Sequence, residues 1–270
     1  MRVRNKDLDR AQDLMWTAFD TAARKERIRL AEEALKICPD CADAYVVLAY
    51  DLPKITRQRK MELFEEGVKA GRRALGPRYF KEEVGSFWGI LETRPYMRAL
   101  MGLAIELEEA GRVDEAIEHY RELMRLNPRD NQGVRYCLAP LYLSLDRLPE
   151  AWKILKTYTD DTGPALNYTR VLYLFKKDGD TEKAREELGE AVRWNPHVVS
   201  WLLTPKLPKI KIGAYITSGG KDEAYVYARD WRKSWEKTEG AIDWLVENLL
   251  AAYREQKRLY ITGWREEEKK

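Results

Sequence analysis

The chain has 270 residues, and its 48 Lys and Arg against 45 Asp and Glu give a formal net charge of +3. A balance this near neutral argues against a general electrostatic nucleic-acid binder, because such proteins concentrate a strong positive excess. Charged residues make up 34% of the chain while Asn and Gln are sparse, a bias typical of thermophilic proteins.

The N-terminal stretch MRVRNKDLDR has basic residues but lacks the apolar segment of a secretory signal. The apolar run AYVVLAY (44–50) is far shorter than the about 18 residues that a membrane-spanning helix needs. We therefore expect a soluble, cytoplasmic chain with no membrane partner.

Helical hairpins are predicted over residues 7–77. RLAEEALKICPD (29–40) is typical of a second helix ending at Pro39, and DAYVVLAY (43–50) begins the next pair. MELFEEGVKAGRRALGP (61–77) closes that pair after a basic turn. An irregular connector is expected over 78–95.

An internal repeat organises the centre of the chain. Each unit has a turn with Gly or Asp, then a helix that opens near an alanine, at Ala116, Ala151 and Ala184. Their separations of 35 and 33 residues average the period of the tetratricopeptide repeat, which is a helix–turn–helix unit. Pro128 and Pro196 end second helices, because a helix rarely continues through proline. Three such repeats are predicted over 96–200.

Residues 201–221 contain prolines and glycines and are expected to form an irregular loop, followed by capping helices over 222–258. In this loop KIKI (209–212) alternates charge and bulk, which predicts Ile210 and Ile212 turned inward and a loop that limits entry to a groove. The fold class is all-α. We expect one domain, 1–270, forming a right-handed α-solenoid of tetratricopeptide-type hairpins with irregular insertions and a C-terminal helical cap.

The last third resembles the suppressor of tumorigenicity 7 family, in particular its soluble prokaryotic relatives. The matching residues are Asn195, Pro196, His197 and Val198, followed by Trp235, Glu239, Gly240 and Ala241. The resemblance covers roughly residues 85–245. It implies a helical-repeat fold without an established catalytic role. Animal members have membrane spans, which this sequence does not show.

The sequence contains only weak matches to motifs for redox, metal or nucleotide sites. CPDC (38–41) has the spacing of redox and zinc sites, but a zinc site needs a second pair and Pro39 fits a repeat-closing turn. TSGGKDE (217–223) fails as a phosphate loop because Tyr215 and Asp222 occupy the glycine and hydroxyl positions, and Asp222 fits a helix N-cap better. We expect no catalytic, cofactor-binding or metal-binding residues and no enzyme activity.

The first helices of such repeats line a concave face. An apolar stripe over Val134, Cys137, Leu138, Leu141 and Leu145 predicts the core side of one of them, preceded by Asp130 or Asn131 as a cap. The residues then expected to face the groove are Arg98, Gln132, Arg135, Tyr136, Thr169, Arg170, Tyr173 and Lys176. The alternative is that these arginines pair with Glu106, Glu108 or Glu109 in solvent.

Arginine and tyrosine suit acidic or aromatic-anchored peptides, because they supply charge-assisted bonds and rigid contact area. The sequence therefore predicts a non-catalytic scaffold that binds a protein or peptide through this groove. Two alternatives stay open: a nucleic-acid-binding repeat protein, for which the basic residues of 53–60 and 204–221 would have to converge, and a regulatory subunit of an enzyme.

Overall fold

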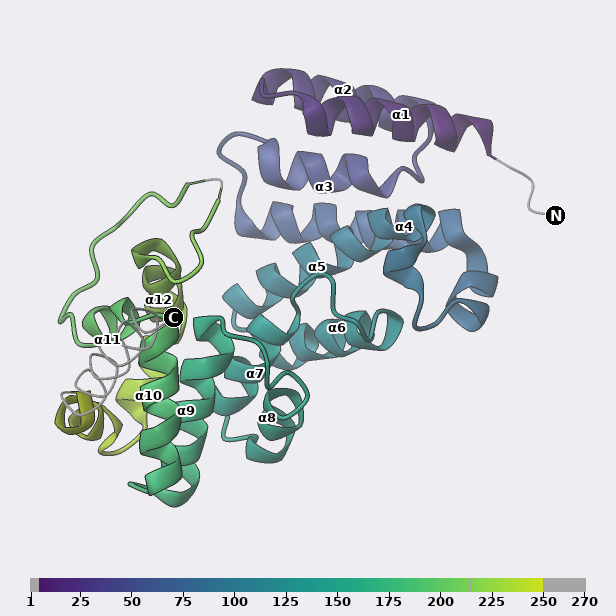
Figure 1. Ribbon diagram of the computed structural model, residues 1–270. Helices are drawn as coiled ribbons and strands as arrows, with labels where there is room; N and C mark the ends of the chain where they lie inside the picture. Colours follow the sequence, from purple (N-terminus) through teal and green to yellow (C-terminus); the bar gives the residue numbers. More distant parts are fainter. Residues whose placement is uncertain (1–4, 214, 250–270) are drawn as a thin grey trace, which may run out of the picture. The chain divides into compact units, whose positions relative to one another are not determined.

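The computed structural model describes residues 5–213 and 215–249, and helices make up most of them. No strand occurs within these ranges. In chain order (Figure 1) the elements are α1 (Lys6–Asp20), α2 (Arg24–Ile37), α3 (Ala42–Asp51), α4 (Arg57–Glu82), the short 3-10 helices η1 (Phe87–Gly89) and η2 (Leu91–Thr93), α5 (Arg94–Glu109), α6 (Val113–Leu126), α7 (Arg135–Ser144), α8 (Leu148–Leu155), α9 (Pro164–Asp178), α10 (Glu182–Trp194), α11 (His197–Leu202) and α12 (Lys221–Lys237). A further helical stretch covers 241–249.

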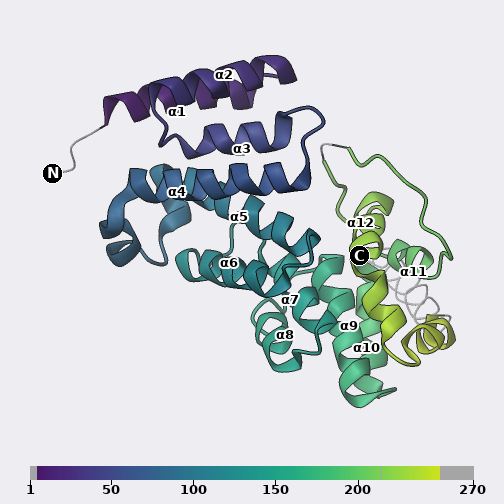
Figure 2. The same cartoon turned by 180° about the vertical axis from the view of Figure 1, so that it is seen from behind.

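The chain divides into two compact units, Met1–Val134 and Arg135–Lys270. The first holds α1 to α6 as three successive antiparallel hairpins, and α7 to α10 form two more hairpins in the second. Both views (Figures 1 and 2) show the helices within each unit stacked side by side. The single domain expected from the sequence stays a prediction.

The N-terminal hairpins follow local signals. The Asn5 side chain accepts hydrogen bonds from the amides of Asp7 and Leu8 at the start of α1, and the Thr56 hydroxyl caps α4. Gly76 has φ +71°, which breaks α4 into two helical parts, and Pro77 begins the second. The expected irregular connector 78–95 is therefore partly wrong, because it contains the end of α4, two 3-10 turns and the start of α5.

Glycines allow α4 and α5 to pack closely. A Cβ atom at Gly71 would lie 2.8 Å from the Cβ of Tyr96. At Gly102 it would lie 2.2 Å from a ring carbon of Phe64, whose side chain is fully buried. Neither helix could approach the other this closely with a larger residue at these positions.

The repeat spacing predicted from the sequence is confirmed in α5 to α10. Ala116, Ala151 and Ala184 are fully buried on the second helices of their hairpins. The turns before them share a second feature, a residue with positive φ at Gly111, Asp146 and Gly179. These positions have the same 35- and 33-residue separations, so each hairpin turns at the same point of its repeat. The all-α helical-repeat fold is established on this basis.

Two details at α7 differ from the expectation. The helix begins at Arg135, and Asp130, with φ +50°, accepts a hydrogen bond from the Val134 amide at 2.7 Å, so it stabilises the preceding turn and is not the N-cap. Leu145 is exposed and lies beyond the end of the helix, which removes it from the expected core stripe.

The C-terminal end is built around the loop 203–220, which joins α11 to α12 and carries no helix in its described part. Gly220, not Asp222, is the N-cap of α12. The Asp222 carboxylate instead accepts from the Thr217 amide at 2.9 Å within the loop. Ile210 is 42% exposed, so its expected inward orientation is wrong. The predicted helix 240–258 is present over 241–249, and its remainder lies outside the described residues.

Candidate functional site

The first helices of the N-terminal unit bring polar side chains from three hairpins together. Arg98 on α5 donates from Nε and Nη2 to the two oxygens of Asp43 on α3, at 2.7 and 2.6 Å. Asp43 is fully buried, and it also accepts a 2.8 Å hydrogen bond from Gln12 on α1. A buried carboxylate needs such partners, because an unpaired charge in the interior is strongly destabilising. The result is an arginine held in a fixed orientation.

Two exposed aromatic side chains lie beside this ion pair. Trp16 and Phe19 of α1 form an edge-to-face pair with ring centroids 6.0 Å apart, and both are more than 40% exposed. The Arg98 guanidinium lies 5.4 Å from the centroid of the Phe19 ring. We call Gln12, Trp16, Phe19, Asp43 and Arg98 the Arg98 cluster. Large aromatic groups exposed next to a held cation can provide anchor points for a partner.

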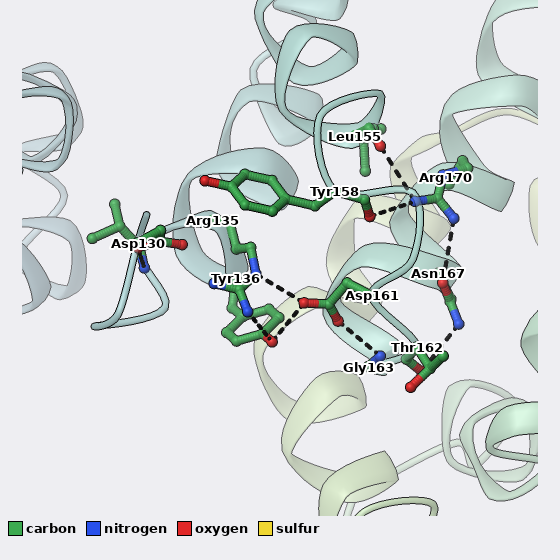
Figure 3. Close-up of polar contacts among 11 residues, drawn as sticks. Asp130, Arg135, Tyr136, Leu155, Tyr158, Asp161, Thr162, Gly163, Asn167 and Arg170 are labelled. Atoms are coloured by element: carbon green, nitrogen blue, oxygen red, sulfur yellow. Dashed lines mark hydrogen bonds and ion pairs between the residues drawn. The ribbon is translucent and has the colours of Figure 1, made fainter. Parts of the chain in front are cut away.

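A second cluster lies in the C-terminal unit (Figure 3), where Arg135 and Tyr136 converge on Asp161. The Asp161 carboxylate accepts from Arg135 Nε at 2.8 Å, from the Tyr136 hydroxyl at 2.7 Å and from the Gly163 amide at 3.0 Å. The guanidinium also lies 4.2 Å from the Tyr136 ring centroid and 5.0 Å from that of Tyr158. We call Arg135, Tyr136, Tyr158 and Asp161 the Arg135 cluster.

This geometry shifts the proton affinity of both acidic groups. Burial by itself would raise the pKa of Asp161, but the hydrogen bonds from Tyr136, Arg135 and Gly163 outweigh it and the pKa is lowered. Burial and the bond to Asp161 raise the pKa of Tyr136 to about 12. At neutral pH the carboxylate is a weak base and the phenol a weak acid. The cluster therefore suits holding side chains in place better than transferring protons.

Arg170 is buried, and its hydrogen bonds connect elements within the C-terminal unit. The residue is 8% exposed, and its guanidinium donates to Glu187 at 2.8 Å. It also donates to Asn167 at 3.3 Å and to the carbonyls of Leu155 and Tyr158 (Figure 3). These bonds tie α9 to α10 and to the turn after α8. The expectation that Arg170 faces an open channel is wrong, because its hydrogen-bonding capacity is used inside the unit.

The other residues expected in the groove separate into buried and accessible ones. Thr169 is buried, and Tyr173 is buried and stacked on Trp152 with centroids 5.0 Å apart, so these two also do not line an open face. Lys176 pairs with Asp146 at 2.6 Å, and Gln132 donates to the Met97 carbonyl at 3.1 Å. Arg98, Gln132, Arg135, Tyr136 and Lys176 are at least partly exposed, and their role in binding a partner stays a prediction.

Two of the glutamates considered as alternative partners of these arginines pair with other basic residues. Glu106 pairs with Lys60 and Arg57, and Glu109 pairs with Arg57. The acidic partners of the groove arginines are Asp43, Asp161 and Glu187, which the sequence reasoning did not single out. A signal for Asp43 was available, because it is the only charged residue in the otherwise apolar stretch 42–50.

The described residues give no support for metal or thiol chemistry. Between residues 5 and 249, leaving aside 214, no group of three His, Cys, Asp or Glu side chains is placed to hold a metal ion. Burial raises the pKa of Cys38, and it raises that of Cys41 to about 12, so both thiols are protonated at neutral pH.

Comparisons with known proteins bear on the fold. A family model described as tetratricopeptide repeat matches residues 107–168. The chain is 25% identical over 260 residues to Protein ST7 homolog of Drosophila pseudoobscura pseudoobscura, which covers 86% of this chain and 47% of that protein. It is 28% identical over 241 residues to the human Suppressor of tumorigenicity 7 protein-like, covering 81% and 42%. The chain thus spans less than half the length of these relatives.

The chain is similar to suppressor of tumorigenicity 7 proteins. The residues that carry this resemblance have structural positions. Asn195 is buried at the end of α10, where its side chain accepts from the His197 amide and donates to the Gly220 carbonyl and to Glu223. Trp235 is fully buried and donates to the Tyr227 hydroxyl at 3.0 Å. These two residues of the resemblance therefore contribute to the packing of the C-terminal unit.

No described helix is long and apolar enough to cross a membrane.

Proposed function

We propose that this protein is a non-catalytic scaffold that binds a protein or peptide segment on the first helices of its repeats. The observation that carries the proposal is the Arg98 cluster. Trp16 and Phe19 expose large aromatic surfaces on α1 beside a guanidinium that Asp43 holds in place. Aromatic and arginine side chains that are already ordered lose little conformational entropy on binding, and these residue types dominate binding energy at interfaces. The tetratricopeptide-type repeats support the same reading.

The ion pairs narrow the chemistry of the partner. The sequence predicted an acidic or aromatic-anchored segment, bound by arginine and tyrosine side chains of the groove. Arg98 and Arg135 each have a carboxylate within hydrogen-bond distance, so their charges are already offset. An acidic partner would have to compete with these carboxylates, whereas aromatic or apolar side chains can pack on Trp16 and Phe19 without disturbing them. We therefore propose an aromatic-anchored segment, with Arg98 donating from the part of its guanidinium that Asp43 does not use.

The test compares two surfaces that both expose large aromatic side chains. Partners are captured from the native host with the wild-type chain, and their binding is then titrated against Trp16→Ser with Phe19→Ser, and against Trp194→Ser as the control. Trp194 is 53% exposed at the end of α10, the second helix of its hairpin. We expect the double variant to lose at least tenfold in affinity and the control to keep wild-type affinity. Equal affinity of all three folded proteins would place the binding surface elsewhere.

A further inference from the structure

The loop between α11 and α12 carries charge of one sign. From Leu203 to Lys221 the sequence contains four lysines and no Asp or Glu. Lys206, Lys209 and Lys211 are exposed, and none of them forms an ion pair with the described residues. The segment therefore carries a formal charge of +4, in a chain whose formal net charge is +3.

The base of the loop is fixed by α12. The Tyr225 hydroxyl donates to the Pro208 carbonyl at 2.6 Å and accepts from the Ile210 amide at 3.3 Å. On the other side Asp222 and Glu223 accept from the amides of Thr217 and Gly219, so the nearest carboxylates are engaged at the base. The backbone of the loop is consequently held against α12 at Pro208 and Ile210 on one side and at Thr217 and Gly219 on the other, while the side chains of Lys209, Lys211 and Tyr215 are exposed.

Apolar side chains are exposed beside the lysines. Ile210 is 42%, Tyr215 91% and Ile216 50% exposed, and nothing in the described chain covers them. We define the loop tip as Lys209, Ile210, Lys211, Tyr215 and Ile216. We propose that the loop tip binds the surface of an anionic lipid bilayer, with the lysines near the phosphate groups and the three apolar side chains inserted at the interface.

The combination of side chains favours a lipid surface over a single-stranded nucleic acid. Lysine stems and a tyrosine ring place an apolar body next to a polar end, which suits the boundary between headgroups and acyl chains. Clustered lysines are attracted to anionic lipid surfaces. A single-stranded nucleic acid would need aromatic platforms for its bases, and the loop tip offers one tyrosine and two isoleucines, which do not stack on bases. The expectation of no membrane partner came from the lack of a spanning segment, and surface binding needs none.

The experiment is co-sedimentation of the full chain with vesicles of phosphatidylcholine containing about 30% phosphatidylserine, beside vesicles of phosphatidylcholine alone. We expect binding to the first and not to the second, with affinity that falls as salt is raised. Lys209→Gln with Lys211→Gln should weaken binding about 25-fold, because each lysine near an anionic surface contributes a factor of about five. Ile210→Ser with Ile216→Ser should also abolish most of it.

The control variants remove exposed lysine and aliphatic side chains outside the loop. Lys25→Gln with Lys81→Gln deletes two exposed lysines, and Leu91→Ser deletes a 56% exposed aliphatic side chain. Both should bind as the wild type does, and melting curves establish that every variant is folded. The proposal is overturned if the wild type does not bind the anionic vesicles, or if the controls lose as much as the loop variants. It is also overturned if the lysine variant alone is impaired and the same lysines are needed to retain single-stranded RNA on a filter, which would identify a nucleic-acid surface.

Discussion

At the scale of single residues, the sequence located the groove arginines on the correct helices but not in the correct surroundings. Arg98, Arg135 and Arg170 do lie on first helices of hairpins, α5, α7 and α9. Helical periodicity gives the direction of a Cα–Cβ bond, whereas an arginine side chain extends several ångströms further and turns toward the nearest acceptor. Their acceptors are 55, 26 and 17 residues away in sequence, a distance at which no local pattern links the partners.

Arg170 gives the clearest prediction at this scale. Arg170→Met leaves Glu187 and two carbonyls without their donor, so the unfolding free energy should fall by about 3 kcal/mol, the lower end for a broken buried pair. The lower end applies because Glu187 keeps some contact with water. Arg193→Met is the control, since its pair with Glu190 is exposed and should contribute about 0–1 kcal/mol. Urea unfolding measures both, and equal stabilities would mean that the Arg170 bonds add nothing to the fold.

At the scale of helices, most boundaries could be predicted and most contacts between helices could not. Pro128, Pro196 and the repeated alanines specify where hairpins begin and end, because these residue types act on their own segment of backbone. The length of α4 escaped prediction, since Gly76 and Pro77 were read as a stop and the chain resumes helix after a single non-helical residue. The close contact of Gly102 with Phe64 joins residues 38 positions apart and has no counterpart in a local pattern.

Two glycine substitutions distinguish the effect of helix propensity on stability from the effect of close contact between helices. Alanine is the better helix former, so Gly189→Ala, where a Cβ meets nothing within 4 Å, should stabilise the protein by about 0.4–1 kcal/mol. Gly102→Ala introduces the same atom against a fully buried ring and should destabilise it by about 1–3 kcal/mol. Thermal melting of both variants gives the signs. A stabilising Gly102→Ala would mean that α4 and α5 are further apart than described.

At the scale of the molecule, the fold class was predictable because the same pattern of a helical hairpin recurs along the sequence. The 34-residue period and the buried alanines identify hairpins that stack on their neighbours, and a chain built in this way has no single core. The candidate site was less predictable, since Trp16 and Phe19 lie in the first hairpin, where the repeat pattern is weakest, and no motif singles them out. The fold indicates a scaffold in general terms. The proposed binding surface rests instead on the exposure and contacts of individual side chains.

The division into Met1–Val134 and Arg135–Lys270 leads to a prediction about independent folding. In a stack of repeats each helix is stabilised mainly by its neighbours, so a fragment that ends at a unit boundary keeps nearly all of its contacts. The fragment 1–134 should therefore be monomeric, strongly helical by circular dichroism and cooperative on melting. The fragment 1–109 is the matched control: it removes α6, whose Ala116, Ile117, Tyr120 and Leu123 are buried, and leaves the apolar face of α5 uncovered. This shorter chain should melt without cooperativity or aggregate. If 1–134 behaves as 1–109 does, the N-terminal hairpins depend on the rest of the chain and the boundary at Val134 is not a folding boundary.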